Sequence, residues 1–296
     1  MTPRISVSQI STFRSSFADD VRDYAAAGLD GIGIWEMKLP DGGDAESLEL
    51  LEASGLERAS AVTAVPSILP MPLLGPPDDP AERLHAYCAS LERLAAFAPA
   101  AVVCVTGSGA GRDPDEARSI VVEGLRTIGA EAQRLGLRIA LEPYQRIDGE
   151  PWSIVFSIPE AIELLRDAGD PPAIGIQFDV WHLWNTPTLF DDIASEIGRF
   201  AGVHVCDYRD PPRAWADRAL PGEGVAGVPA ILAALDAAGW DGLYDVEIFS
   251  DDGTFGTELP DSHWAAPALE TLARARDAVR RSLSPALNQP TKDEVT

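Results

Sequence analysis

Residues 174–182 read IGIQFDVWH, an apolar run that reaches a carboxylate, Asp179, near its end. Three more runs share this layout: LRIALEP (137–143) with Glu142, FAGVHVCD (200–207) with His204, and GLYDVEIFS (242–250) with Glu247. Short, continuous apolar runs are typical of parallel strands that are covered on both faces. In a barrel of such strands the carboxyl ends open on one face, so we expect the four side chains to lie together there.

The rest of the chain continues the same alternation. We expect eight strands, at residues 5–8, 31–35, 59–65, 101–106, 138–142, 174–179, 202–206 and 243–248. Helical patterns lie between them, at 17–27, 81–97, 115–135, 157–168, 228–238 and 262–283, with weaker ones at 44–54 and 188–197. The sequence therefore predicts an α/β protein, a single-domain (β/α)₈ TIM barrel over residues 1–284, followed by a disordered tail at 285–296.

The alternative fold is a doubly wound open sheet. That fold calls for a glycine-rich turn after the first strand, but the first strand here is followed by QIST (9–12). The proline-rich stretch PSILPMPLLGPPDDP (66–80) is short and apolar. We expect it to form a loop over the barrel mouth rather than a boundary between domains.

Composition excludes several classes of function. The chain has 296 residues, a net charge of −24 and a pI near 4.4, and a surface this acidic repels nucleic acid and anionic lipids. It has no apolar run of membrane-spanning length, and its first residues, MTPRISVSQI, do not resemble a signal peptide. Three widely spaced cysteines, Cys88, Cys104 and Cys206, fit free thiols in the cytoplasm.

The four strand-end side chains predict a metal site. Glu142, Asp179, His204 and Glu247 end four consecutive strands, so one ion can contact all of them. Three carboxylates suit a divalent cation, and one imidazole favours Mn, Co, Fe or Zn over Ca. The alternative is four unrelated polar residues, but buried carboxylates are costly unless they are paired or bound to metal.

Further candidates lie close to these strand ends. His182 is either a partner for a substrate hydroxyl or an ordinary loop histidine, and Arg209 is the arginine nearest the strand end in DYRDPPRAWADR (207–218). Trp35 and Glu36 end the second strand, where they can line a sugar site or simply form the rim. The flanking aromatic residues are Trp152, Trp181, Trp184 and Phe249. The loop PGEGVAGVP (221–229) precedes a helix but contains Glu223 and no lysine, which argues against a phosphate site.

These motifs resemble the xylose isomerase-like TIM barrel superfamily, the sugar phosphate isomerase/epimerase group. The resemblance spans essentially the whole chain and rests on LEP at Glu142, FDVWH (178–182), HVCD (204–207), PGEG (221–224) and DVE at Glu247. It implies that Glu142 and Glu247 are both metal ligands and acid/base groups, with Asp179 and His204 as the other ligands. It also implies that His182 contacts the substrate, and Arg209 matches the arginine of the family only loosely.

The resemblance implies one divalent ion, most often Mn, with Mg, Co, Fe or Zn as alternatives. It implies an isomerase or epimerase of a keto sugar or inosose that works by α-proton abstraction through a metal-stabilised enediolate. The alternatives are a β-eliminating lyase (an inosose dehydratase, or an enzyme that cleaves 3-oxo-glycosides or C-glycosides) and a non-catalytic sugar-binding barrel. The expected partners are a small carbohydrate and either a second copy or, for a C-glycoside lyase, a small second subunit. Four histidines and the acidic charge argue against an abasic-site endonuclease.

Overall fold

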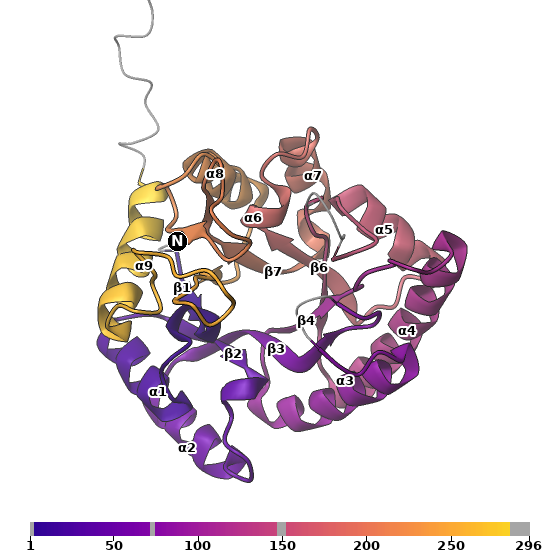
Figure 1. Ribbon diagram of the computed structural model, residues 1–296, viewed down its shortest axis with the longest axis horizontal. Coiled ribbons are helices and arrows are strands. Elements are labelled where there is room, and N and C mark those ends of the chain that lie inside the picture. Colours follow the sequence, from indigo (N-terminus) through magenta and orange to yellow (C-terminus); the bar gives the residue numbers. More distant parts are fainter. Residues whose placement is uncertain (1–2, 72–74, 147–151, 285–296) are drawn as a thin grey trace, which may run out of the picture.

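A closed barrel of eight parallel strands forms the centre of the protein, as predicted (Figure 1). The computed structural model describes residues 3–71, 75–146 and 152–284. In spatial order the barrel strands are β1 (Ile5–Ser8), β2 (Gly31–Trp35), β3 (Glu57–Ser67), β4 (Ala101–Val105), β5 (Ile139–Glu142), β6 (Ile174–Asp179), β7 (Phe200–Val205) and β10 (Tyr244–Val246). The tail at 285–296 lies outside the described residues.

Helices surround the barrel. They are α1 (Phe17–Ala26), α2 (Asp44–Ser54), α3 (Pro80–Leu94), α4 (Pro114–Leu135), α5 (Ile158–Asp167), α6 (Val180–Leu183), α7 (Leu189–Glu196), α8 (Val228–Ala238) and α9 (Ala268–Ser282), with 3₁₀ turns η1 (Gln9–Thr12), η2 (Glu36–Lys38), η3 (Ala95–Phe97) and η4 (Ile197–Arg199). Several carry the expected end signals: Ser157 caps α5 through the amide of Glu160, and Gly136 ends α4 with a φ of 71°. Each apolar helix face packs on the strands, so one core runs around the barrel.

Several features of the structure differ from the prediction. Helix α9 begins at Ala268 rather than at residue 262, because Pro267 disfavours a helical conformation for the residue before it. Strand β10 ends at Val246, so Glu247 follows the strand directly. A short hairpin, β8 (Asp207–Tyr208) with β9 (Arg218–Ala219), was not predicted, because two-residue strands are too short to show any periodicity.

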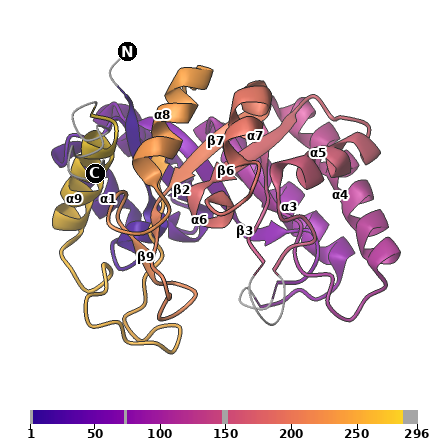
Figure 2. The same cartoon turned by 90° about the horizontal axis from the view of Figure 1, so that it is seen from above.

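The loops after the strands' carboxyl ends form one face of the molecule. Figure 2 shows the loops around β9 on one side of the barrel and the N-terminus on the other. Of the proline-rich stretch at 66–80, residues 72–74 lie outside the described residues, whereas Pro66 and Met71 line a cavity at the barrel mouth. The prediction of a loop there is wrong at its start, because β3 continues to Ser67.

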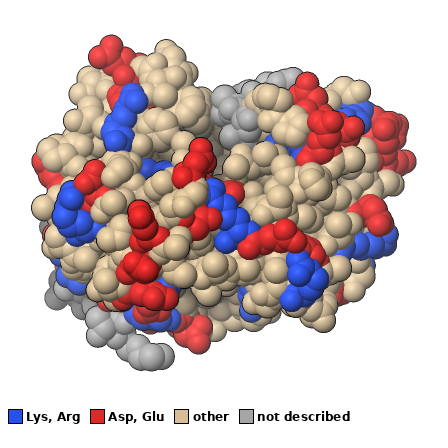
Figure 3. Space-filling model, turned by 90° about the horizontal axis from the view of Figure 1, so that it is seen from below, with Lys and Arg blue, Asp and Glu red and all other residues tan. Residues whose placement is uncertain are grey.

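The surface and the helices agree with the charge and hydropathy of the sequence. On the face drawn in Figure 3, acidic side chains are spread over the surface and basic ones lie among them. Among the helices of the described residues, none combines the length and the apolar character needed to cross a membrane.

A buried ion pair joins α1 to the loop after β2. Lys38 Nζ donates to Asp20 Oδ2 at 2.6 Å and to the carbonyl oxygens of Gln9 and Thr12. The two charged side chains are 6% and 0% exposed. Burial raises the pKa of Asp20 and lowers that of Lys38, and their attraction opposes both shifts.

Lys38→Met should therefore destabilise the protein, because it leaves the Asp20 carboxylate buried without its cation. We expect a loss of about 3 kcal/mol in the free energy of unfolding, measured by urea denaturation. Arg22→Met is the matched control: Arg22 pairs with Asp19 and Asp23 on the same helix but is 65% exposed, so its loss should cost less than about 1 kcal/mol. Equal losses in the two variants would contradict the assignment.

Candidate metal centre

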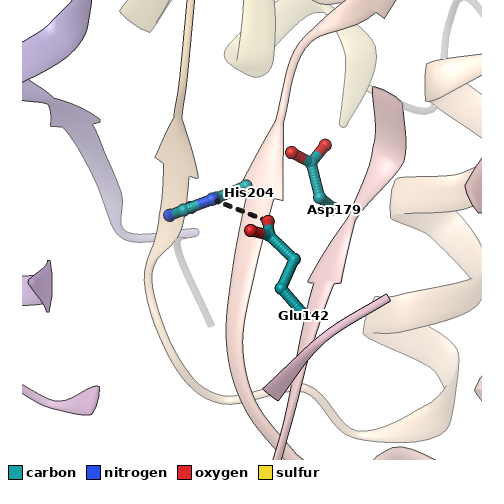
Figure 4. Close-up of side chains that lie close together, drawn as sticks. All are labelled: Glu142, Asp179 and His204. Atoms are coloured by element: carbon teal, nitrogen blue, oxygen red, sulfur yellow. Dashed lines mark ion pairs between the residues drawn. The ribbon is translucent and has the colours of Figure 1, made fainter. Parts of the chain in front are cut away.

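Three side chains from neighbouring strands converge at the carboxyl ends of the barrel. Glu142 ends β5, Asp179 ends β6 and His204 lies one residue before the end of β7. Each offers one ligand atom, and these atoms all lie within 4.8 Å of one another. Figure 4 shows the carboxylate of Glu142 beside the imidazole of His204, with Nδ1 and Oε1 3.6 Å apart. All three residues are buried, so their charges face one another rather than water.

Glu247 reaches the same imidazole from the other side of β7. Its Oε2 lies 3.5 Å from His204 Nδ1. Its Oε1 accepts a long hydrogen bond from Ser8 Oγ at 3.4 Å, and the indole of Trp35 donates to that same hydroxyl at 2.7 Å. Residues from β1 and β2 thus orient a carboxylate that follows β10.

Hydrogen bonds below the centre fix how His204 is protonated. The hydroxyl of Ser60 donates its only proton to Asp245 Oδ2 at 2.6 Å. It must therefore accept from His204 Nε2, which lies 3.0 Å away. In the neutral ring, which is the form that binds a metal, this leaves the lone pair of Nδ1 pointing at the two glutamates, as in metal-binding histidines whose second nitrogen is hydrogen-bonded.

Burial and charge shift the pKa of the central groups in a way that suits a cation. Burial raises the pKa of Glu142 to about 7, although the nearby His204 opposes the shift. Burial alone would lower the pKa of His204, but the carboxylates of Glu247, Glu142 and Asp245 raise it to about 10. A positive charge among these carboxylates is therefore strongly favoured, whether a proton or a metal ion supplies it.

The residues fit a divalent ion. Among the described residues, His204 Nδ1 and Glu142 Oε1 are buried and have no hydrogen-bond partner, which is rare for polar atoms in a folded protein unless something else binds them. Carboxylate oxygens and one imidazole nitrogen form a donor set for a hard or borderline cation. Glu142, Asp179 and His204 are thus a possible metal-binding group, beside which Glu247 lies.

Metal binding should become tighter as the pH rises. An ion displaces the protons that the raised pKa values of Glu142 and His204 hold on the ligands. Both groups are protonated below about pH 7, so the apparent affinity for Mn²⁺ should climb most steeply there and keep rising towards pH 10. Calorimetry in buffers of different ionisation enthalpy at neutral pH should detect proton release; an affinity that does not change between about pH 6 and 8 would contradict this prediction.

Arg218, which sequence reasoning did not single out, lies against the centre. The hairpin of β8 and β9 returns the chain over the barrel, so that Arg218 Nη1 donates to Asp179 Oδ2 at 3.1 Å and to Glu247 Oε2 at 3.0 Å. Its guanidinium lies over the rings of Trp181 and Phe249, 4.9 and 4.7 Å from their centroids. This geometry restricts the group to one orientation.

Two of the predicted substrate-binding residues lie away from the centre. Arg209 binds Asp217, with Nε 3.1 Å from Oδ1, and does not line the central cavity. Glu36 points away from the cavity. Its Oε2 accepts a hydrogen bond from the backbone N–H of Ala64 at 2.8 Å, and its Oε1 lies 3.5 Å from Arg93 Nη1. These contacts use the charged groups of both side chains, so few of their atoms are left to bind a ligand.

His182 does line the cavity and has a defined hydrogen-bonding state. Its Nδ1 accepts the backbone N–H of Gln145 at 3.3 Å, so the proton of a neutral ring lies on Nε2. Burial, with Arg218 and His204 nearby, lowers its pKa well below the usual value. Nε2 is buried and unpartnered, and the ring stacks on Tyr144 at 3.8 Å. His182 is thus a neutral hydrogen-bond donor beside the centre.

The cavity above the centre has a volume of about 400 Å³. Its floor contains Glu142, His182, His204, Arg218 and Glu247. Trp35, Trp152 and Phe249 line it, as the sequence suggested, whereas Trp181 and Trp184 pack beside Tyr208 instead. The size is within the range of small-molecule sites.

Known structures share this fold. A protein, SMc04130, from Sinorhizobium meliloti 1021 is 25% identical with a TM-score of 0.81, covering 94% of this chain and 98% of its own. The IolI protein, solved with a binding zinc atom, is 20% identical with a TM-score of 0.75, covering 95% and 98%. The 3-keto-D-glucoside 4-epimerase YcjR from E. coli is 19% identical with a TM-score of 0.70, covering 93% and 100%.

A comparison with curated protein sequences gives no match. The family model described as xylose isomerase-like TIM barrel matches residues 21–278. That match covers most of the barrel, including every strand from β2 to β10. The chain therefore belongs to the xylose isomerase-like TIM barrel family.

Proposed function

We propose that this protein is a metal-dependent sugar isomerase or epimerase that removes a proton from the carbon next to a carbonyl group. One observation carries the proposal: two buried glutamates, Glu142 and Glu247, flank the free nitrogen of His204 at 3.6 and 3.5 Å. Epimerisation by proton transfer needs one group to remove a proton and a second to deliver one to the opposite face, whereas isomerisation can use either glutamate to return the proton to the neighbouring carbon. The epimerase and zinc-bound protein among the structural relatives support the same class.

Each polar group of the cavity floor has a role in this chemistry. Glu142, Asp179, His204 and Glu247 would hold the ion, which supplies Lewis-acid polarisation of the substrate carbonyl when bound. Glu142 would exchange a proton with the substrate on one side of the planar intermediate, and Glu247 would act on the other side. Arg218 and the Nε2–H of His182 would donate hydrogen bonds to substrate oxygens.

A β-eliminating lyase is the second candidate, favoured by the largely apolar upper cavity. The first step would be the same removal of an α-proton. The electron pair of that C–H bond would then form a carbon–carbon double bond and expel a substituent from the β-carbon, which leaves with its bonding pair and takes up a proton. An apolar cavity above the reacting carbons gives such a leaving group a place to bind.

The substrate should be a sugar without a phosphate group. The carboxylate of Asp207 already accepts the backbone N–H groups of Tyr208, Gly222 and Ala226, so the PGEG loop has few amides left for an anion. We expect a sugar to react at least ~10-fold faster than its phosphate ester, because the site is surrounded by carboxylates. Comparing kcat/KM for such a pair checks this, and a preference for the ester would contradict it.

Manganese is the ion that we propose, since three carboxylates and one imidazole suit it well. All three cysteines are free, which fits a reducing compartment such as the cytoplasm. A homo-oligomer remains a proposal that gel filtration can check.

The decisive experiment incubates the Mn²⁺-loaded protein in D₂O with ketoses, inososes and 3-oxo-glucosides and follows each by proton NMR. Loss of an α-proton signal shows enolisation, a new epimer shows an epimerase, and an unsaturated product shows a lyase. The Asp179→Asn variant is the control, because it weakens the ion site without removing either glutamate. The absence of exchange for every class would contradict the proposal.

A further inference from the structure

A wall of aromatic rings encloses the cavity above the polar floor. Besides Tyr144, six rings line it: Phe13, Trp35, Trp152, Trp215, and the two rings of the loop after β10, Phe249 and Phe255. Trp215 connects several of these rings. Its ring centroid lies 5.5 Å from that of Trp152, 5.6 Å from that of Phe249 and 5.3 Å from that of Phe255. These spacings are those of favourable aromatic pairs, so the wall is a continuous surface.

Aliphatic residues complete this lining. Val62, Met71, Val103 and Val105 form an apolar cluster with Trp35 that is separate from the main core. At the mouth, Met37 and Phe255 are 57% and 42% exposed although both line the cavity. Apolar side chains gathered around an open cavity, rather than scattered over a surface, are typical of a binding site.

The aromatic wall offers few hydrogen-bonding partners to the hydroxyl groups of a free sugar. Each of its hydroxyl groups loses hydrogen bonds to water on entry and needs a partner in return. Beyond the floor, the polar side chains of the described lining are Thr63, Tyr144 and Thr254, and Thr254 already binds Asp252 and Arg14. The floor can therefore hold one sugar ring, whereas the part of the upper lining that the structure describes offers few partners for further hydroxyls.

We propose that the substrate is a keto aryl glycoside: its sugar ring, which carries the carbonyl group, lies on the polar floor, and its aromatic aglycone lies against the wall around Trp215. This inference rests on the proposed function for the sugar end only. The aromatic end depends on the wall itself, because ring stacking and burial of apolar area need no metal and no catalytic group.

The test measures binding separately from chemistry. The Mn²⁺-loaded full-length protein is titrated by calorimetry with phenyl β-D-glucoside and methyl β-D-glucoside, which share the sugar and lack the reactive carbonyl. We expect the phenyl compound to bind at least ~10-fold more tightly, since it buries an aromatic ring in addition. Equal affinities would overturn the inference.

Two variants locate the binding surface. Trp215→Ala and Phe255→Ala should each reduce the phenyl-to-methyl preference by at least ~3-fold, and both side chains are partly exposed, so the fold should tolerate their loss. Phe190→Ala is the matched control: Phe190 is 52% exposed on α7 and does not line the cavity. A preference that survives both cavity variants, or that falls equally in the control, would overturn the assignment.

Proton exchange with an unsubstituted keto sugar in D₂O separates the two proposals. Exchange without any phenyl preference leaves the proposed function standing and overturns the aryl site. A phenyl preference without exchange on any keto sugar, substituted or not, supports the aryl site and contradicts the proposed function. If a second copy of the chain instead covers the wall, the phenyl preference should weaken as the protein concentration rises, which also overturns the inference.

Discussion

Glu247→Gln is expected to lower turnover by at least ~10²-fold, the usual scale for losing a positioned acid or base. The substitution keeps the size of the side chain and one oxygen that can still accept from Ser8. It removes the negative charge that faces His204 Nδ1 and Arg218. Metal binding should survive in part, since Glu142, Asp179 and His204 still converge, so measuring Mn²⁺ affinity beside kcat separates the two roles.

Glu142→Gln is the partner variant. If the two glutamates work from opposite faces, one variant should still exchange the α-proton with D₂O, whereas neither should invert the centre. His182→Ala distinguishes the lyase, in which elimination should stop while exchange continues, because His182 would donate a proton to the leaving group but would not remove the α-proton. Inversion by either glutamine variant would rule out a two-base scheme, and full turnover with retained metal in Glu247→Gln would make Glu247 a ligand only.

The fold could be predicted because its signal repeats. Each strand of the barrel is buried on both faces and is followed by a helix with its own end signals, so periodicity and caps agree along the chain. The convergence of Glu142, Asp179 and His204 follows from the same regularity, because consecutive parallel strands end at one face. A strand-end position is fixed by the barrel itself, and no detail of a loop is needed.

Residues on loops could not be placed in this way. Arg209 is closest in sequence to the end of β7, but the chain needs the hairpin of β8 and β9 to return over the barrel, and this brings Arg218 to the carboxylates. The pairing of Arg209 and Arg213 with Asp217 shapes this turn. The signal that pointed to Arg218 was weak: it is one of three arginines in the stretch at 207–218, and the one furthest in sequence from β7.

The aromatic wall was only partly foreseen for the same reason. Trp35 and Phe249 lie at strand ends and were expected at the mouth, but Phe13, Trp215 and Phe255 come from loops whose paths sequence does not reveal. Trp181, although next to two site residues, points into the core, because the short helix α6 turns it away from the cavity. The turn of α6 thus directs Trp181 away from the site residues next to it in sequence. Loops that are distant in sequence, in contrast, bring their rings together at the cavity.

Arg218→Met should cause the largest loss of stability at this site, because it leaves the buried carboxylates of Asp179 and Glu247 without their shared cation. Removing one partner from a buried ion pair costs about 3–5 kcal/mol, which corresponds to a decrease in Tm of roughly 5–8 °C for a domain of this size. Calorimetric scans with and without Mn²⁺ check this. The loss should be smaller with the ion bound, since the ion then supplies the missing positive charge.

Arg209→Met is the matched control for this variant. Arg209 is 31% exposed and shares Asp217 with Arg213, so its removal leaves that carboxylate still paired and should lower the free energy of unfolding by less than about 1 kcal/mol. Turnover should also fall more in Arg218→Met than in Arg209→Met. Loss of a hydrogen-bond donor that points at a charge developing on the substrate costs ~10²–10³-fold in kcat, and we expect this loss for Arg218 but not for Arg209. Equal effects of the two variants, or a Tm loss in Arg218→Met that Mn²⁺ leaves unchanged, would show that Arg218 does not balance the charge of the metal ligands.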